Sequence, residues 1–352
     1  MSARSLVRDR ADELYARLTS LEDLLLTRRF SLYGVAFSRV LAALTYVGIL
    51  VTNFGHRQIL FGAASDWVRP YRESFPQAPW VGVFENLSAT AFTFVYLLVI
   101  VVGVAFLLGW HARLTGPALL FGAYQIIEMN PVVHDQGDNI LRIGFFFLLL
   151  TDNAAVWSLD ARRRARREQS GEGVRGILGG VAGRVDSWNS SGRLSTAKTL
   201  LHNGAVFALS AQLVIIYIAA GMFKVSGNGW KFGTAISYPL RLDEYQVWPF
   251  LNDFVVASAV GVWFMTYAAV FLQLYFPVLL INRVTRRIAL VAVVGLHVSI
   301  AILMGLPWFT LAMVAFDGIF VSTATYQALE GWFVPQVTNL RQNLARRLVR
   351  SS

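Results

Sequence analysis

Long uninterrupted runs of apolar residues dominate the hydropathy pattern of this chain. A helix needs about 20 such residues to cross a bilayer core about 30 Å thick. The runs are continuous and do not alternate, which favours helices over the strands of a barrel. We therefore predict an all-α, polytopic membrane helix bundle with about eight transmembrane helices. Their approximate bounds are 33–54, 92–109, 113–129, 139–157, 200–222, 254–281, 287–305 and 307–325.

The segments outside these runs are polar and basic. Residues 1–29 place apolar side chains at spacings of four and three, which predicts a cytoplasmic amphipathic helix that lies on the membrane surface or against another helix. They lack the apolar core of a signal peptide. Residues 30–325 form the predicted transmembrane domain, interrupted at 160–199 by a basic cytoplasmic linker rich in Arg, Gly and Ser. A short basic tail, 326–352, follows.

The distribution of positive charge predicts the orientation of the helices. Of the 31 Lys and Arg residues, 23 fall on the side that holds both termini, six fall on the other side, and two lie within the apolar runs. Cytoplasmic loops collect Lys and Arg, so both termini are predicted to be cytoplasmic in a multi-pass protein of the cell (inner or plasma) membrane. The same rule accounts for the net charge of +10 without a nucleic-acid partner.

Several kinds of chemistry are excluded or unsupported by the residues present. The chain has no cysteine, which removes thiol nucleophiles and cysteine metal sites. The glycine-rich stretch that begins at Gly171 lacks the Lys-Ser/Thr ending of a phosphate-binding loop. His134 and Asp138 have metal-ligand chemistry, but no further His/Glu cluster accompanies them, so no metal site is predicted.

Charged residues inside apolar runs are candidates for function because they are costly to bury in lipid. Arg39 lies about two turns into the first run, where it can reach a polar cavity or form a buried structural pair. Asp138 and Arg142 lie four residues apart at the start of the fourth run, a spacing that lets them pair on one helix face. An ordinary ion pair at a helix end is the alternative to a functional role.

Lys224 and His297 are two further candidates. Lys224 follows the fifth run directly, so it is either an anchor at the membrane interface or an amine kept uncharged by apolar surroundings, able to act as a base. His297 lies in the seventh run, where a core histidine with one hydrogen-bond partner is the alternative to a catalytic one.

Two predicted outer segments are rich in aromatic residues. Residues 55–91 contain Trp67, Tyr71 and Trp80, whose rings suit the membrane interface. Residues 223–253 contain Trp230, Tyr238, Tyr245 and Trp248. These segments predict contact with membrane lipid and with a secreted peptide or protein.

Four motifs, in order, resemble the membrane domain of the vitamin K-dependent γ-glutamyl carboxylases and of the HTTM (horizontally transferred transmembrane) family. The likeness covers about residues 30–325. It rests on Phe37-Ser-Arg39, on Asp138-Asn-Ile-Leu-Arg-Ile-Gly with the later Trp157-Ser-Leu-Asp160, on Tyr217-Ile-Ala-Ala-Gly-Met-Phe-Lys224 with Trp230-x-x-Gly233, and on His297-Val-Ser-Ile-Ala-Ile-Leu-Met-Gly305-Leu-Pro-Trp-Phe309.

The resemblance implies a membrane enzyme that uses a reduced quinone of the menaquinone or vitamin K type. Lys224 would be the base that deprotonates the quinol, with His297 and Asp138 completing the catalytic set, and water would be kept from the reacting centre. The residues implied in binding the quinone are Arg39, Arg142, Trp230 and Trp308.

The sequence departs from the carboxylases in two ways. Asp138 stands where they carry an active-site histidine, and a carboxylate cannot perform every task of an imidazole. A large lumenal substrate domain is also not found. Two functions are therefore expected: carboxylase- or epoxidase-like quinol chemistry at the outer face, or a non-catalytic factor of the SdpB type that assists the maturation of a secreted peptide. A small-solute transporter is a third and less favoured function, because the sequence shows no internal repeat of the kind found in many transporters.

Overall fold

The structure, a computed structural model, describes residues 25–74, 82–170, 193–333 and 335–336. Most of the predicted amphipathic helix at 1–29 lies outside the described residues. So do positions 171–192 of the predicted linker and positions 337–352 of the predicted tail.

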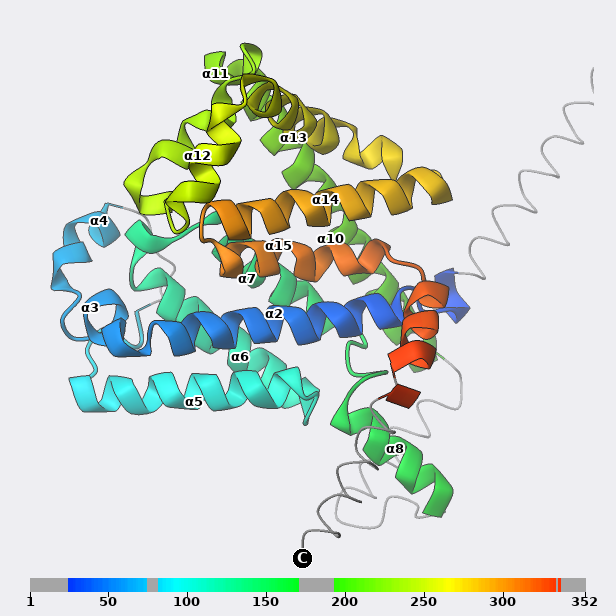
Figure 1. Cartoon of the computed structure of the whole chain (residues 1–352). Helices are drawn as coiled ribbons and strands as arrows, with labels where there is room; N and C mark the ends of the chain where they lie inside the picture. Colours follow the sequence, from blue (N-terminus) through cyan, green and yellow to red (C-terminus); the bar gives the residue numbers. More distant parts are fainter. Residues whose placement is uncertain (1–24, 75–81, 171–192, 334, 337–352) are drawn as a thin grey trace, which may run out of the picture.

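The described part of the chain is helical and contains no strand, which confirms the predicted all-α class (Figure 1). The longer helices are α2 (Leu32–Thr52), α5 (Ala89–Leu107), α6 (Ala112–Glu128), α7 (Gln136–Leu150), α8 (Leu159–Ser170), α10 (Arg193–Ser226), α12 (Pro249–Ala257), α13 (Ala259–Leu279), α14 (Arg283–Leu303) and α15 (Pro307–Asp317). The short ones are α3 (Arg57–Phe61), α4 (Arg69–Glu73) and α11 (Asn228–Lys231).

Helix α2 lies at the centre of the bundle and packs against α5, α7 and α15 (Figure 1). Helix α6 packs between α5 and α7, while α14 covers α15, and α13 joins α14 to α10. The long helices define two ends. One carries α3 and α4, and is called here the α3–α4 end. The other carries α8, and is called the α8 end (Figure 1).

Each of the eight predicted runs coincides with a helix, but fewer meet the size of a complete membrane span. Five described helices are long and apolar enough to cross, namely α2, α5, α10, α13 and α14. Helices α6, α7 and α15 have only 17, 15 and 11 residues. Residues 307–320 and 323–333 form a pair bent by 112°, which raises the number to six if they count as one span. The number eight and the sidedness of the termini stay predictions.

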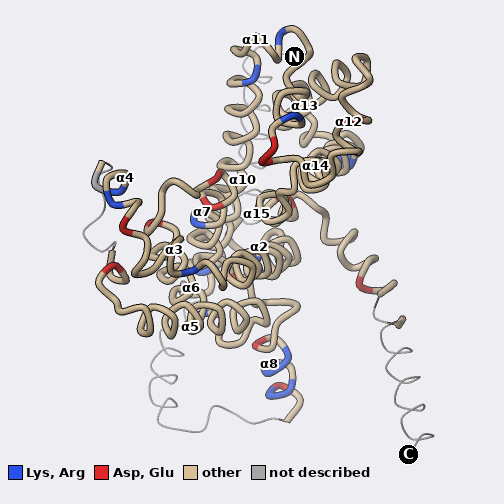
Figure 2. Tube along the Cα trace, turned by 60° about the vertical axis from the view of Figure 1, so that its left-hand side comes forward, with Lys and Arg blue, Asp and Glu red and all other residues tan. Residues whose placement is uncertain are grey.

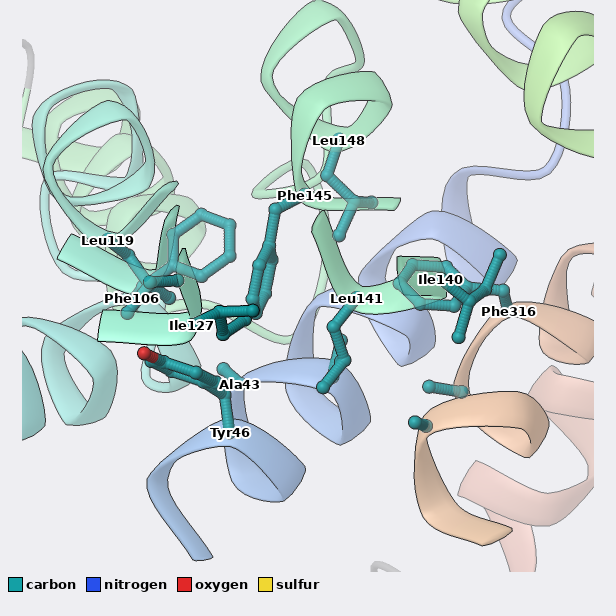
Figure 3. Close-up of a cluster of buried hydrophobic side chains, with 14 of the residues drawn as sticks. Ala43, Tyr46, Phe106, Leu119, Ile127, Ile140, Leu141, Phe145, Leu148 and Phe316 are labelled. Carbon is teal, nitrogen blue, oxygen red and sulfur yellow. The ribbon is translucent and has the colours of Figure 1, made fainter. Parts of the chain in front are cut away.

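Arginines are concentrated on α8, the most basic of the described helices (Figure 2). The middle of the bundle is filled by apolar side chains from α2, α5, α6, α7 and α15 (Figure 3). Glycines allow α15 to approach closely, because the ring of Trp308 packs on Gly48 of α2 and the ring of Phe316 packs on Gly144 of α7. Close approach at small residues is the usual way helices associate in lipid.

Polar contacts at the α8 end join the two halves of the chain. The side chain of Asn203 on α10 accepts a hydrogen bond from the backbone N–H of Phe30 and donates to carbonyls of the preceding turn. His202 accepts a hydrogen bond from the backbone N–H of Asp152, and its other ring nitrogen contacts the Phe30 carbonyl at 2.7 Å. Arg29 forms an ion pair with Asp152. The start of α2, the end of α7 and the start of α10 are thereby fixed to one another.

Arg39 is completely buried on α2 and binds backbone carbonyls of other segments. Its guanidinium donates to the carbonyls of Asn153 at 3.1 Å, Phe106 at 2.7 Å and Trp157 at 2.7 Å, and also to that of Leu107. These carbonyls lie at the C-terminal end of α5 and in the turn between α7 and α8. Helix ends leave carbonyls without intrahelical partners, and a buried guanidinium with a fixed fork of donors can bind several of them.

Replacing Arg39 with methionine should therefore loosen the α8 end of the bundle. We expect Arg39→Met to lower the free energy of unfolding by about 3 kcal/mol, because several buried carbonyls lose a charged donor. Equilibrium unfolding in mixed micelles measures this change. Arg113→Met is the matched control, since Arg113 is exposed on α6. Equal stability of the two variants would contradict the structural role of Arg39.

Candidate functional site

Three buried polar side chains from three helices meet between α10, α14 and α15. The hydroxyl of Tyr217 donates a hydrogen bond to Asp317 Oδ2 at 2.8 Å and lies 3.4 Å from Nε2 of His297. The exposed fractions are 1% for Tyr217, 2% for His297 and 2% for Asp317. We call these residues the polar triad. Tyr217 is its central member and contacts both of the others.

The protons of the polar triad follow from its hydrogen bonds. Tyr217 has a single hydroxyl proton and directs it to Asp317. For His297 to bond to the same hydroxyl oxygen, its Nε2 must carry the proton and donate. In a neutral imidazole the other nitrogen, Nδ1, is then an acceptor. The contacts thus define a His297 tautomer whose free lone pair lies on Nδ1.

Two atoms of the polar triad have no hydrogen-bond partner in the described part of the chain: His297 Nδ1 and Asp317 Oδ1. Both are acceptors in the arrangement above. A buried polar atom left without a partner costs about 1–3 kcal/mol, and such atoms in a folded protein require an explanation. Two unpaired acceptors in one cluster suit a ligand that brings hydroxyl or ammonium donors.

The surroundings of the polar triad are aromatic and apolar. The ring of Tyr217 packs on Phe276 of α13, with centroids 4.3 Å apart, and the His297 ring lies 5.9 Å from that of Phe309. The hydroxyl of Thr310 donates to the backbone carbonyl of His297 at 2.7 Å, which ties α14 to α15 beside the imidazole. In such apolar surroundings electrostatic interactions are stronger than in water.

Lys224 lies beyond the polar triad, toward the end of α10. It is seven residues from Tyr217, so both side chains leave the same face of the helix about 10 Å apart along its axis. The amine is half-buried and lies 5.2 Å from the centroid of the Trp230 ring, in a cation–π contact. It is also close enough to the His297 imidazole for the charges of the two groups to interact. Two of the three predicted catalytic residues therefore belong to one region.

Asp138, the third predicted catalytic residue, lies elsewhere. It is in the first turn of α7, where it forms a capping box with Asp135. In the described structure no hydrogen bond, ion pair or electrostatic contact joins it to Lys224 or His297. It belongs to the helix start, and its predicted catalytic role stays a prediction.

The ion pair between Asp138 and Arg142 that their spacing allows does not form in the described structure. Arg142 forms its ion pair with Glu128 at the end of α6, donates to Asn139, and lies over the ring of Tyr124. The spacing of four residues allows an intrahelical pair, but a carboxylate on the neighbouring helix competes with it and is positioned by the packing of α6 on α7. Arg142 thus joins the two helices near the α3–α4 end.

The other residues predicted to bind a quinone lie in different places. Trp230 stacks with Lys224 and therefore borders the site. Trp308 packs on Gly48 in the contact between α15 and α2. Arg39 and Arg142 are occupied by carbonyls and by Glu128. The contacts of Arg39, Arg142 and Trp308 are structural, and their binding of a quinone stays a prediction.

Tyr217 and Asp317 are not among the site residues predicted from the sequence, although both are central to the geometry. Tyr217 is the first residue of the motif that ends at Lys224. Asp317 is a lone carboxylate inside the last apolar run, and the rule that selected Arg39 as a charge inside a span would have selected it too.

Residues 182–324 match the HTTM domain family, which confirms the predicted resemblance to that family. The matched region contains the polar triad, Lys224 and Trp230. No solved structure matches. The chain is thus a multi-pass helical membrane protein in which residues 182–324 are similar to the HTTM domain.

A curated relative extends the likeness beyond this domain. The chain is 24% identical to sporulation-delaying protein SdpB of Bacillus subtilis (strain 168) over 259 residues. The similarity covers 71% of this chain and 69% of that protein. It agrees with the expectation that the HTTM family includes SdpB-type relatives.

The hydrogen bond between Tyr217 and Asp317 can be tested by a double-mutant cycle. We expect Tyr217→Phe and Asp317→Asn to be non-additive by about 1–2 kcal/mol in the free energy of unfolding, because each removes the same buried bond. Tyr96→Phe with Asp317→Asn is the matched control cycle, since the buried Tyr96 hydroxyl bonds to the Leu50 carbonyl. A cycle that is additive for Tyr217 would contradict the contact.

Proposed function

We propose that this protein is a cell-membrane enzyme that takes up a reduced lipid quinone and removes a proton from its hydroxyl group, with Lys224 as the base. The observation that carries the proposal is the pair of unpartnered buried acceptors, His297 Nδ1 and Asp317 Oδ1, together with a His297 imidazole that is close enough to Lys224 for their charges to interact. A hydroquinone would supply two hydroxyl donors for such acceptors and, once deprotonated, a reductant for oxygen.

The residues present suit such a ligand in their polarity. Aromatic rings of Phe276, Phe309 and Trp230 border the polar atoms, as is usual where a flat apolar ligand is oriented by a few polar groups. Helix α10 also presents exposed Met222 and Phe223 beside Lys224, so the region is continuous with surface that faces lipid. A lipid-soluble substrate could reach it without entering water.

Each residue has a distinct task in this proposal. Lys224 accepts the hydroxyl proton when its amine is uncharged. His297 orients the substrate through Nδ1, and Asp317 accepts a second hydrogen bond through Oδ1. Tyr217 holds the imidazole and the carboxylate in place. The aromatic rings exclude water, which would otherwise return a proton to the quinol oxyanion.

Replacing Lys224 should abolish turnover while leaving the fold intact. In vesicles containing reduced menaquinone and oxygen, we expect formation of the quinone epoxide, measured by mass spectrometry. Lys224→Ala should lower the rate by about 100- to 10,000-fold, the range usual for a lost general base. Lys231→Ala is the matched control, because Lys231 is exposed on α11.

Lys224→Arg separates charge from basicity, since arginine keeps the positive charge but does not give up its proton. It should be as inactive as the alanine variant. An unchanged rate in Lys224→Ala, or no turnover by the wild-type protein, would contradict the enzymatic proposal.

The second candidate is a non-catalytic factor that assists the maturation of a secreted peptide, as the SdpB-type resemblance implies. The likeness to SdpB over most of both chains favours it. Exposed aromatic side chains at the α3–α4 end and on the segment around α12 would provide the contact surface. They are Trp67, Tyr71, Tyr238, Trp248, Phe250 and Phe254.

Site-specific photo-crosslinking distinguishes this role. A photoreactive residue in place of Tyr71 or Trp248 should capture a secreted peptide in cells, whereas the same residue in place of Arg167 on α8 should not. Capture of lipid alone from Tyr71 and Trp248 would count against a peptide partner and would leave the enzymatic proposal standing.

A further inference from the structure

Helix α8 is a basic surface that the proposed function does not use. Five of the six residues from 162 to 167 are arginines, and all five are exposed. The helix has no buried residue and stands clear of the bundle (Figures 1 and 2). Because these neighbouring positive charges repel one another, an anionic partner would stabilise the helix.

The base of α8 is fixed firmly to the bundle. The backbone N–H groups of Leu159 and Asp160 donate to the carbonyls of Leu108 and Gly109, both at 3.0 Å. The Asp160 carboxylate accepts hydrogen bonds from the first backbone N–H groups of α6, at 3.0 and 2.9 Å. These bonds therefore hold the arginines in a fixed position beside the C-terminal end of α5 and the N-terminal end of α6.

Exposed apolar and aromatic side chains lie next to the base of α8. Leu114 on α6 is 72% exposed, and the neighbouring Trp110 and Trp157 are partly exposed. Tryptophan is enriched at the level of lipid headgroups. The guanidinium of Arg163 lies 5.9 Å from the centroid of the Trp110 ring, which links the basic helix to this aromatic layer.

The arginines of α8 differ in their structural duties. Arg163 pairs with Asp160, and Arg164 donates to the carbonyl of Ala154 at 2.7 Å. The side chains of Arg162, Arg166 and Arg167 form no hydrogen bond, ion pair or cation–π contact with the described part of the chain. Their guanidinium groups are free to bind phosphate, for which the planar fork of donors is well suited.

We propose that α8 binds the phosphate groups of anionic lipids in the leaflet at the α8 end. The charge is complementary, and the site is continuous with the lipid-facing surface through Trp110 and Leu114. The density of positive charge at this end is what the positive-inside rule assigns to the cytoplasmic leaflet, whose surface is negative and attracts such segments. The proposal does not depend on the chemistry at Lys224.

Lipid binding by the purified full-length chain tests this proposal. Native mass spectrometry from detergent micelles would count bound phosphatidylglycerol and phosphatidylcholine over a titration of each. We expect the wild-type protein to prefer phosphatidylglycerol. The triple variant Arg162→Gln, Arg166→Gln, Arg167→Gln should bind phosphatidylglycerol at least about tenfold more weakly, because three charges near the headgroups are lost.

The matched control has the same change of charge at the same end of the bundle. Arg283→Gln, Arg286→Gln, Arg287→Gln at the start of α14 should keep most of the preference. Thermal unfolding of both triple variants checks that the fold is retained. Glycerol phosphate, added at the same concentration as the lipid, should not displace it, which separates a lipid headgroup from a free phosphate.

Three outcomes would overturn the proposal. The first is an α8 variant that binds phosphatidylglycerol as the wild type does. The second is an equal loss in both triple variants, which would show that only total charge matters. The third is displacement of bound lipid from the wild type by an equimolar single-stranded RNA, which would assign the helix to nucleic acid.

Discussion

A bilayer offers no water to a polar group in its interior, so each such group must find its hydrogen bonds within the protein. Arg39 meets this constraint fully, because its guanidinium is bound to the carbonyls that end α5 and follow α7. Asn203 and His202 meet it at the junction of α10 with α2. The triad of Tyr217, His297 and Asp317 meets it only in part, and this difference separates the scaffold from the candidate site.

The scaffold and the candidate site occupy different parts of the chain. Helices α2, α5, α6 and α7 form a closely packed body with glycine contacts and a buried arginine. The polar triad and Lys224 all lie within the region that matches the HTTM domain. The central residue, Tyr217, positions the other two members, and Lys224 stands two helical turns further along the same face. Deprotonation of a lipid-soluble hydroxyl requires a base in aromatic and apolar surroundings.

Much of the fold follows from hydropathy alone, since each predicted run coincides with a helix. Contacts between residues of different helices were harder to predict, because they depend on which helices become neighbours. The partner of Arg142 is Glu128 on α6, and no intrahelical spacing reveals a contact between helices. The partners of Arg39 are backbone carbonyls, which no residue pattern records. Lys224 and His297 could be selected from the family resemblance and from their place in apolar runs. Asp317 satisfied the same criterion, yet only the fold shows that it faces Tyr217.

Photoaffinity labelling tests most directly whether the triad and Lys224 form one site for a quinone. A reduced quinone carrying an azido group would be incubated with the protein in vesicles, illuminated, and its adducts mapped by mass spectrometry. We predict adducts on the segment from Tyr217 to Trp230 and around His297 and Phe309, displaced by unlabelled quinone. Adducts confined to the lipid-facing side of α5, or adducts that unlabelled quinone does not displace, would contradict a site at Lys224.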